Sequence, residues 1–194
     1  MTTYDAKTAL VIVDVQNDFA DPKGSLYVRN GADIVPLVNA EIVAAHQAGV
    51  PVYYTQDWHP PSTPHFQKDG GIWPVHCVED TWGAEFHPDL TVDGPIVRKG
   101  DDGSDGYSGF SARDPRSGET SVTPLDSMLR AMERDRFILC GLATDYCVVE
   151  TALDGVRLGY GVEVLSQGIR AVDLQPGDGD RAIERMRAAG ATIT

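Results

Sequence analysis

The amino-acid sequence predicts an α/β fold in which a doubly wound, mainly parallel sheet of about six strands carries helices on both faces. Two observations support this prediction. Strand-like apolar runs alternate along the chain with segments of helical periodicity, and the first run, at 9–15, is apolar almost throughout. Unbroken apolar strands are typical of parallel sheets, because helices bury both of their faces.

The first half of the chain contains three predicted strands, one predicted helix and a long loop. Strands are favoured by the β-branched and aromatic residues at 9–15, 51–55 and 95–98. Apolar residues at helical spacing predict a helix over 34–48, with Pro36 in its first turn and Gly49 as its stop. The segment 58–94 is rich in Pro, Gly, His and Trp without a clear period, which indicates a long functional loop.

In the second half, Thr123 and Pro124 begin a predicted helix that continues to about residue 134. Apolar residues at helical spacing predict two further helices, over 145–158 and 180–189. Apolar and β-branched runs predict strands at 136–140, 162–165 and 191–194. The chain shows no internal repeat or linker, and 194 residues suit one domain, so we expect a single domain over 1–194.

Composition excludes several classes of function. The 29 acidic residues outnumber the 16 Lys and Arg residues and give a formal net charge of −13, which disfavours nucleic acids and anionic membrane surfaces as partners. No apolar run is long enough to span a membrane and the N-terminal residues lack a basic signal-like region, so a cytoplasmic protein is expected. The odd cysteine count predicts reduced thiols at Cys77, Cys140 and Cys147.

Four residues of catalytic type fall at the carboxyl ends of predicted strands. In strand order they are Asp14, Asp57, Lys99 and Cys147. Singly, each has an ordinary structural explanation as a cap, a turn residue, a surface lysine or a core cysteine. Ligands bind outside the carboxyl ends of strands in open parallel sheets, so the coincidence of all four at one edge predicts a shared functional crevice.

Cys147 lies at a predicted strand–turn–helix junction, in the segment GLATDYCV at 141–148. A helix N-terminus favours a thiolate and offers free N–H groups that could hold an oxyanion. Lys99 nearby would lower the pKa of the thiol further, and Asp14 could accept its proton. The alternative is a small buried cysteine that packs a helix against the sheet, a description that fits Cys140 better.

A second group of side chains has the types and spacing of metal ligands. Asp57 and His59 stand two residues apart and point the same way from an extended segment, and His65 and His76 follow. One Asp with two or three His residues is a ligand set for a divalent transition metal: zinc, iron or manganese. Loop histidines also often cap turns or face solvent, and Cys77 is a weaker alternative as a further ligand or a rival nucleophile.

Seven short segments stand out in order along the chain. They are VDVQNDF at 13–19, QDWHP at 56–60, WPVHCV at 73–78, GAEFHP at 83–88, RKG at 98–100, YSGF at 107–110 and GLATDYCV at 141–148. Together they resemble the nicotinamidase branch of the isochorismatase-like cysteine hydrolases, and the resemblance runs almost the full length of the chain.

The resemblance implies roles for particular residues. The implied catalytic triad is Asp14, Lys99 and Cys147. The implied oxyanion hole consists of the N–H groups of Ala143 and Cys147, oriented by a cis peptide bond between Leu142 and Ala143.

It also implies a metal site and a ring-binding pocket. The implied metal ligands are Asp57, His59 and His76, with His65 at a further position that some relatives use. The implied substrate-binding residues are Phe19, Trp73 and Tyr107.

The implied reaction is metal-dependent hydrolysis of nicotinamide to nicotinate and ammonia through a thioester, a step of NAD salvage. A small-molecule amide is the expected partner, zinc is the expected metal with iron or manganese as alternatives, and a homo-oligomer is left open. Segments 61–66 and 100–106 depart from the family pattern beside the pocket. A sister amidohydrolase of a ureido, carbamoyl or other small amide is therefore the alternative, with a non-catalytic metal- or ligand-binding relative as a further one.

Overall fold

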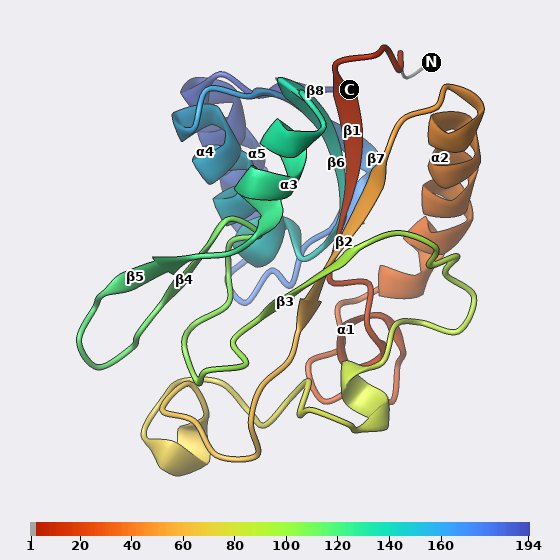
Figure 1. Ribbon diagram of the computed structural model, residues 1–194. Helices are drawn as coiled ribbons and strands as arrows, with labels where there is room; N and C mark the ends of the chain where they lie inside the picture. Colours follow the sequence, from red (N-terminus) through yellow and green to blue (C-terminus); the bar gives the residue numbers. More distant parts are fainter. Residues whose placement is uncertain (1–2) are drawn as a thin grey trace.

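The structure, a computed structural model that describes residues 3–194, contains a parallel sheet of six strands (Figure 1). Residues 1 and 2, which the predicted domain includes, lie outside the described part. The strands are β1 (Thr8–Val13), β2 (Val52–Asp57), β3 (Ile96–Lys99), β6 (Arg136–Leu142), β7 (Gly161–Arg170) and β8 (Thr192–Ile193). Their order is β3-β2-β1-β6-β7-β8, so the winding reverses between β1 and β6 and the predicted doubly wound sheet is confirmed.

Helices cover both faces of the sheet (Figure 1). On one face lies α2 (Val35–Gln47), and on the other lie α3 (Leu125–Ala131), α4 (Val149–Arg157) and α5 (Asp178–Ala189). Successive residues of β1 serve both layers: Val11 and Val13 belong to the core under α3–α5, whereas Leu10 and Ile12 belong to the core under α2. Because side chains alternate across a strand, this two-sided burial requires the unbroken apolar run.

Several short elements differ from the sequence prediction. A single helical turn, α1 (Asn17–Ala20), follows β1 and is too short for a helical period to show. An antiparallel hairpin of β4 (Ser111–Arg113) and β5 (Thr120–Val122) projects from the body of the molecule (Figure 1). Because β5 is exposed throughout, it lacks the alternation of polar and apolar residues that marks a half-buried strand.

The remaining elements are short turns of helix. They are η1 (Gly31–Ile34), η2 (Gln67–Asp69), η3 (Trp82–Ala84) and η4 (Thr144–Val148). The middle two lie within the predicted long loop 58–94, which is otherwise irregular. Among residues 3–194, no helix combines the length and apolar character that crossing a bilayer requires.

Candidate active site

A buried lysine joins two carboxylates at the carboxyl edge of the sheet. Lys99, the last residue of β3, donates hydrogen bonds to Asp14 Oδ2 at 2.7 Å and Asp57 Oδ1 at 2.6 Å. Its ammonium also donates to the carbonyl oxygen of Gly106. Asp14, just beyond β1, accepts a further bond from the Thr55 hydroxyl at 2.6 Å. Three strands thus bring their ends together as the sequence predicts, and the sheet register places the side chains within bonding distance.

Burial and charge act in opposite directions on these three groups. Burial favours the neutral form of Lys99, but the two carboxylates raise its pKa well above the ordinary value, so it is an ammonium. Burial would also raise the pKa of Asp57, yet Lys99 and the neighbouring histidines hold it below the usual range. For Asp14, burial dominates and raises the pKa to about 6 despite Lys99. Of the two carboxylates, Asp14 therefore takes up a proton more readily than Asp57.

Replacing Lys99 with methionine should destabilise the protein strongly, because two buried carboxylates would lose their shared counter-charge. We expect the free energy of unfolding in urea to fall by about 3–5 kcal/mol, the usual cost of breaking a buried ion pair from one side. Arg187→Met is the matched control: both side chains of its ion pair with Glu184 are more than half exposed, and solvent screening should leave stability nearly unchanged. Equal stabilities of the Lys99 variant and the wild type would contradict this account.

Cys147 completes the group from the turn between β6 and α4. Its Sγ lies 3.8 Å from Lys99 Nζ, and its Sγ and the carboxylates of Asp14 and Asp57 lie within 4.8 Å of one another. The preceding peptide bond between Leu142 and Ala143 is cis, as the resemblance implied. Four side chains from four separate strand ends are therefore gathered at one point.

The thiol of Cys147 differs from the sequence expectation in one respect. Burial raises its pKa well above the ordinary value, and although Lys99 acts in the opposite sense, it does not outweigh burial and the two carboxylates. A neutral thiol needs a base before it can attack a carbonyl. Asp14, within the same cluster, is placed to be that base.

The other two cysteines have structural positions. Cys140 lies inside β6 and is fully buried in the core under α2. Cys77 is also buried, and its backbone N–H donates to Asp18 Oδ2 at 2.7 Å. All three thiols are unpaired, in agreement with the prediction of reduced cysteines.

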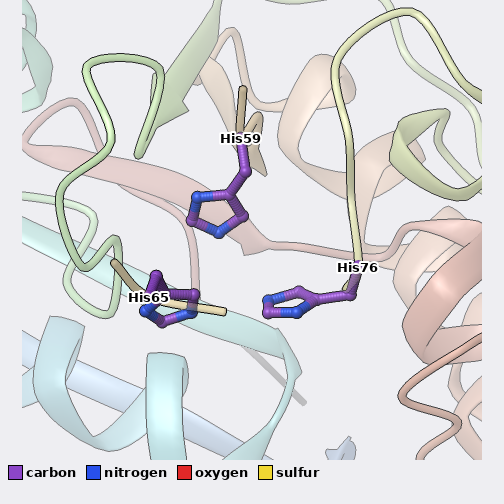
Figure 2. A group of neighbouring side chains, drawn as sticks. All are labelled: His59, His65 and His76. Carbon is purple, nitrogen blue, oxygen red and sulfur yellow. The ribbon is translucent and has the colours of Figure 1, made fainter. Parts of the chain in front are cut away.

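Three histidines gather beside this group, and their rings face a common centre (Figure 2). His59, His65 and His76 are nearly fully buried, and one nitrogen from each lies within 4.8 Å of the other two. Both ring nitrogens of His59 are buried without a hydrogen-bond partner, which is costly unless another ligand satisfies one of them. Burial lowers the pKa of His76 to about 4, so its ring is the neutral form that binds metals.

Asp57 links the histidines to the catalytic-type group. Its Oδ2 lies 3.8 Å from His59 Nε2, while its Oδ1 accepts the bond from Lys99. Three imidazoles beside one carboxylate form a donor set suited to a divalent transition metal. The four residues predicted as ligands are thus brought together. Asp57 lies at the edge of this set, and its carboxylate is also bonded to Lys99.

A cavity opens over both groups. Its lining consists of Phe19, Leu26, Asp57, His65, Trp73, His76, Gly106, Tyr107, Ala143, Tyr146, Cys147 and Val172. All three aromatic residues predicted to bind substrate belong to this lining, and Trp73 Nε1 donates to the Tyr107 hydroxyl at 2.7 Å. A cavity with mostly aromatic and apolar walls and a few polar groups suits a small aromatic ligand.

Sequence reasoning missed Tyr146 in this wall. Its ring meets that of Trp73 edge-on at 4.9 Å between centroids and lies beside Tyr107. The available signal was its position directly before Cys147, at the start of a helix whose first turn faces the cavity. Leu26 and Val172 carried no signal, because loop packing alone brings them to the cavity.

Sequence reasoning also missed two side chains that hold the loops in place. The amide of Gln16 accepts a bond from the Asp57 N–H and donates to the carbonyl oxygens of Asp57 and Ala84, each at 2.8 Å. The carboxylate of Asp18 accepts bonds from the N–H groups of Cys77 and Ser25. Apart from the bond to Ser25, these contacts join residues 41 to 68 positions apart in the chain, so no local pattern could reveal them.

Comparison with known proteins places this chain among characterised sequences. It is 38% identical to the nicotinamidase of Escherichia coli over 203 residues, which cover 95% of this chain and 93% of that protein. It is also 38% identical to the nicotinamidase/pyrazinamidase of Mycobacterium tuberculosis over 198 residues, covering 95% and 97% of the two chains.

Solved structures agree with the sequence comparison. The pyrazinamidase of Pyrococcus horikoshii in complex with zinc matches with a TM-score of 0.85 at 38% identity, covering 97% of this chain and 98% of the other. PnC1 from L. infantum in complex with nicotinate matches with a TM-score of 0.89 at 31% identity, covering 100% and 95%. The isochorismatase domain family matches residues 8–194, a range that contains every residue of the site described above. This protein belongs to the isochorismatase family.

Proposed function

We propose that this protein is a nicotinamidase, a cysteine amidohydrolase that converts nicotinamide to nicotinate and ammonia. The observation that carries the proposal is the buried Asp14–Lys99–Cys147 group at an aromatic cavity that His65 and His76 also line. Relatives named nicotinamidase over nearly the whole chain support the substrate, as does a related structure that holds nicotinate.

In the first half of the reaction, Cys147 Sγ bonds to the carboxamide carbon, and the carbonyl electron pair moves to oxygen. The thiol proton passes to Asp14, which the neighbouring Lys99 holds in place. When the carbonyl reforms, the carbon–nitrogen bond breaks and Asp14 gives the proton to the departing nitrogen, which leaves as ammonia. The product is a thioester on Cys147.

In the second half, water adds to the thioester carbonyl while Asp14 accepts one of its protons. The carbon–sulfur bond then breaks, the proton on Asp14 returns to Cys147 Sγ, and nicotinic acid leaves and ionises to nicotinate in solvent. We assign the N–H groups of Ala143 and Cys147 as the oxyanion hole for both additions, since both residues line the cavity beside the nucleophile.

The aromatic walls and the histidines would orient the substrate ring. Phe19, Trp73 and Tyr107 bound the cavity and exclude water from the reacting carbonyl. We propose that His59, His65, His76 and Asp57 hold a divalent ion, for which the donor set and the zinc complex of a relative favour zinc. When bound there, this ion supplies a coordination position for the pyridine nitrogen and so anchors the ring.

The cellular role that fits this reaction is NAD salvage. The proposed ligand is a small amide, and we propose that the whole chain acts as one catalytic domain. The cytoplasm is the proposed location, which the three unpaired thiols support.

Ammonia release from nicotinamide is the test of this proposal. Zinc-loaded protein should turn nicotinamide over, a chelated sample should fall to background, and added zinc should restore the rate. Benzamide, which lacks the ring nitrogen, is the matched control and should react far more slowly if the ring is anchored through that nitrogen.

Two outcomes would contradict the proposal in different ways. Zinc-loaded protein that releases no ammonia from nicotinamide would exclude the substrate, and ureido and N-carbamoyl compounds in the same assay would then identify a sister amidohydrolase. Full activity after the metal has been removed would leave the hydrolysis standing and exclude the anchoring role of the ion.

A further inference from the structure

The acidic loop 100–106 is bonded to both halves of the site. Gly100 lies against the His59 ring so closely that a Cβ there would be 2.5 Å from Nδ1. The carbonyl oxygen of Gly103 accepts a bond from the Thr63 hydroxyl at 2.7 Å, two residues before His65. At its far end, the loop offers the Gly106 carbonyl to Lys99. The loop therefore lies against the histidine group at its start and contacts Lys99 at its end.

Asp105 is the acidic residue of this loop that reaches a histidine. Its Oδ1 lies 2.5 Å from His65 Nδ1, and the two side chains are only 16% and 5% exposed. Its backbone is held in turn, because Asp105 and Arg113 exchange N–H···O bonds of 2.7 and 3.1 Å. The carboxylate is thus aimed at the ring from an anchored segment.

This contact determines which nitrogen of His65 is free. The Asp105 carboxylate occupies Nδ1, which leaves Nε2 as the ring nitrogen available to a metal ion. The ring also stacks on His59 with 4.7 Å between centroids, and its orientation is therefore set from two sides. His76 Nδ1 instead meets the backbone carbonyl of Pro74 at 2.8 Å, a contact that no side-chain substitution removes.

We infer that Asp105 is a positioning residue that makes His65 a metal ligand, by holding its ring with Nε2 toward His59 and His76. This inference rests on the metal site of the proposed function, not on the identity of the substrate. A carboxylate bonded to the far nitrogen of a ligating histidine commonly strengthens metal binding by about 10- to 100-fold.

Zinc affinity, measured by competition with a chromogenic chelator on apo protein without substrate, tests the inference. Asp105→Ala should weaken zinc binding by about 10- to 100-fold, and Asp105→Asn, which keeps an acceptor but loses the charge, should fall between it and the wild type. Asp101→Asn is the matched control, since it removes one negative charge from an exposed position of the same loop and should leave the affinity unchanged.

A double-mutant cycle with His65→Ala separates positioning from a general effect on the loop. If Asp105 acts through His65, then adding Asp105→Ala to His65→Ala should weaken zinc binding no further. Additive losses, an equal loss in Asp101→Asn, or wild-type affinity in either Asp105→Ala or His65→Ala would each overturn the inference. A wild type that binds zinc through this pair but releases no ammonia from nicotinamide would overturn the substrate assignment alone.

Discussion

Replacing Cys147 with alanine should abolish the release of ammonia from nicotinamide, with kcat reduced by at least about 10³-fold. Sγ is the atom proposed to bond to the carbonyl carbon, and the neighbouring residues offer no substitute for it. Lys99 is a donor in this site and Asp14 is assigned as the base. The measurement is steady-state ammonia release at saturating zinc, together with zinc content and melting temperature.

The chain offers a matched control for this change. Cys140→Ala removes the same atom from a buried cysteine on the other face of the sheet, and its kcat should stay close to the wild-type value. Zinc binding and folding should survive in both variants. Cys147 is not one of the proposed zinc ligands, and it lies near that set only at Asp57. Turnover above a few per cent in Cys147→Ala, with ordinary folding, would remove Cys147 from the nucleophile role.

Replacing Asp14 with asparagine should lower kcat/KM by about 10²- to 10⁴-fold, the usual contribution of a general base. The amide has nearly the shape of the carboxylate but cannot accept the thiol proton, and the raised pKa of the Cys147 thiol makes that transfer necessary. Lys99 would keep its bonds to Asp57 and Gly106, so the site should remain assembled.

A single-turnover experiment gives the sharper readout for Asp14→Asn. With enzyme in excess over nicotinamide, neither ammonia nor a thioester should accumulate, because the base acts before the first bond forms. A burst of ammonia at the wild-type rate followed by a stalled thioester would instead confine Asp14 to the hydrolysis step. Asp154→Asn, on α4 and outside the cavity, is the matched control and should behave as the wild type.

Much of the architecture followed from local patterns. The unbroken apolar run of β1 predicted a strand buried on both faces, and the alternation of strands and helices predicted the doubly wound sheet. That topology then brought Asp14, Lys99 and Cys147 to one edge, because polar residues after parallel strands share the carboxyl end. The hairpin β4–β5 escaped prediction because each strand has only three residues and β5 is exposed throughout.

The sequence by itself determined the fold class, the edge of the sheet that carries the chemistry, and the kinds of side chain gathered there. These follow from short-range periodicity and from residue types placed after strands. Only the tertiary structure decided that burial raises the pKa of Cys147, that Asp105 reaches His65, and that Tyr146 closes the aromatic wall. Desolvation and contacts between distant loops depend on how the whole chain packs, and a linear pattern does not contain that information.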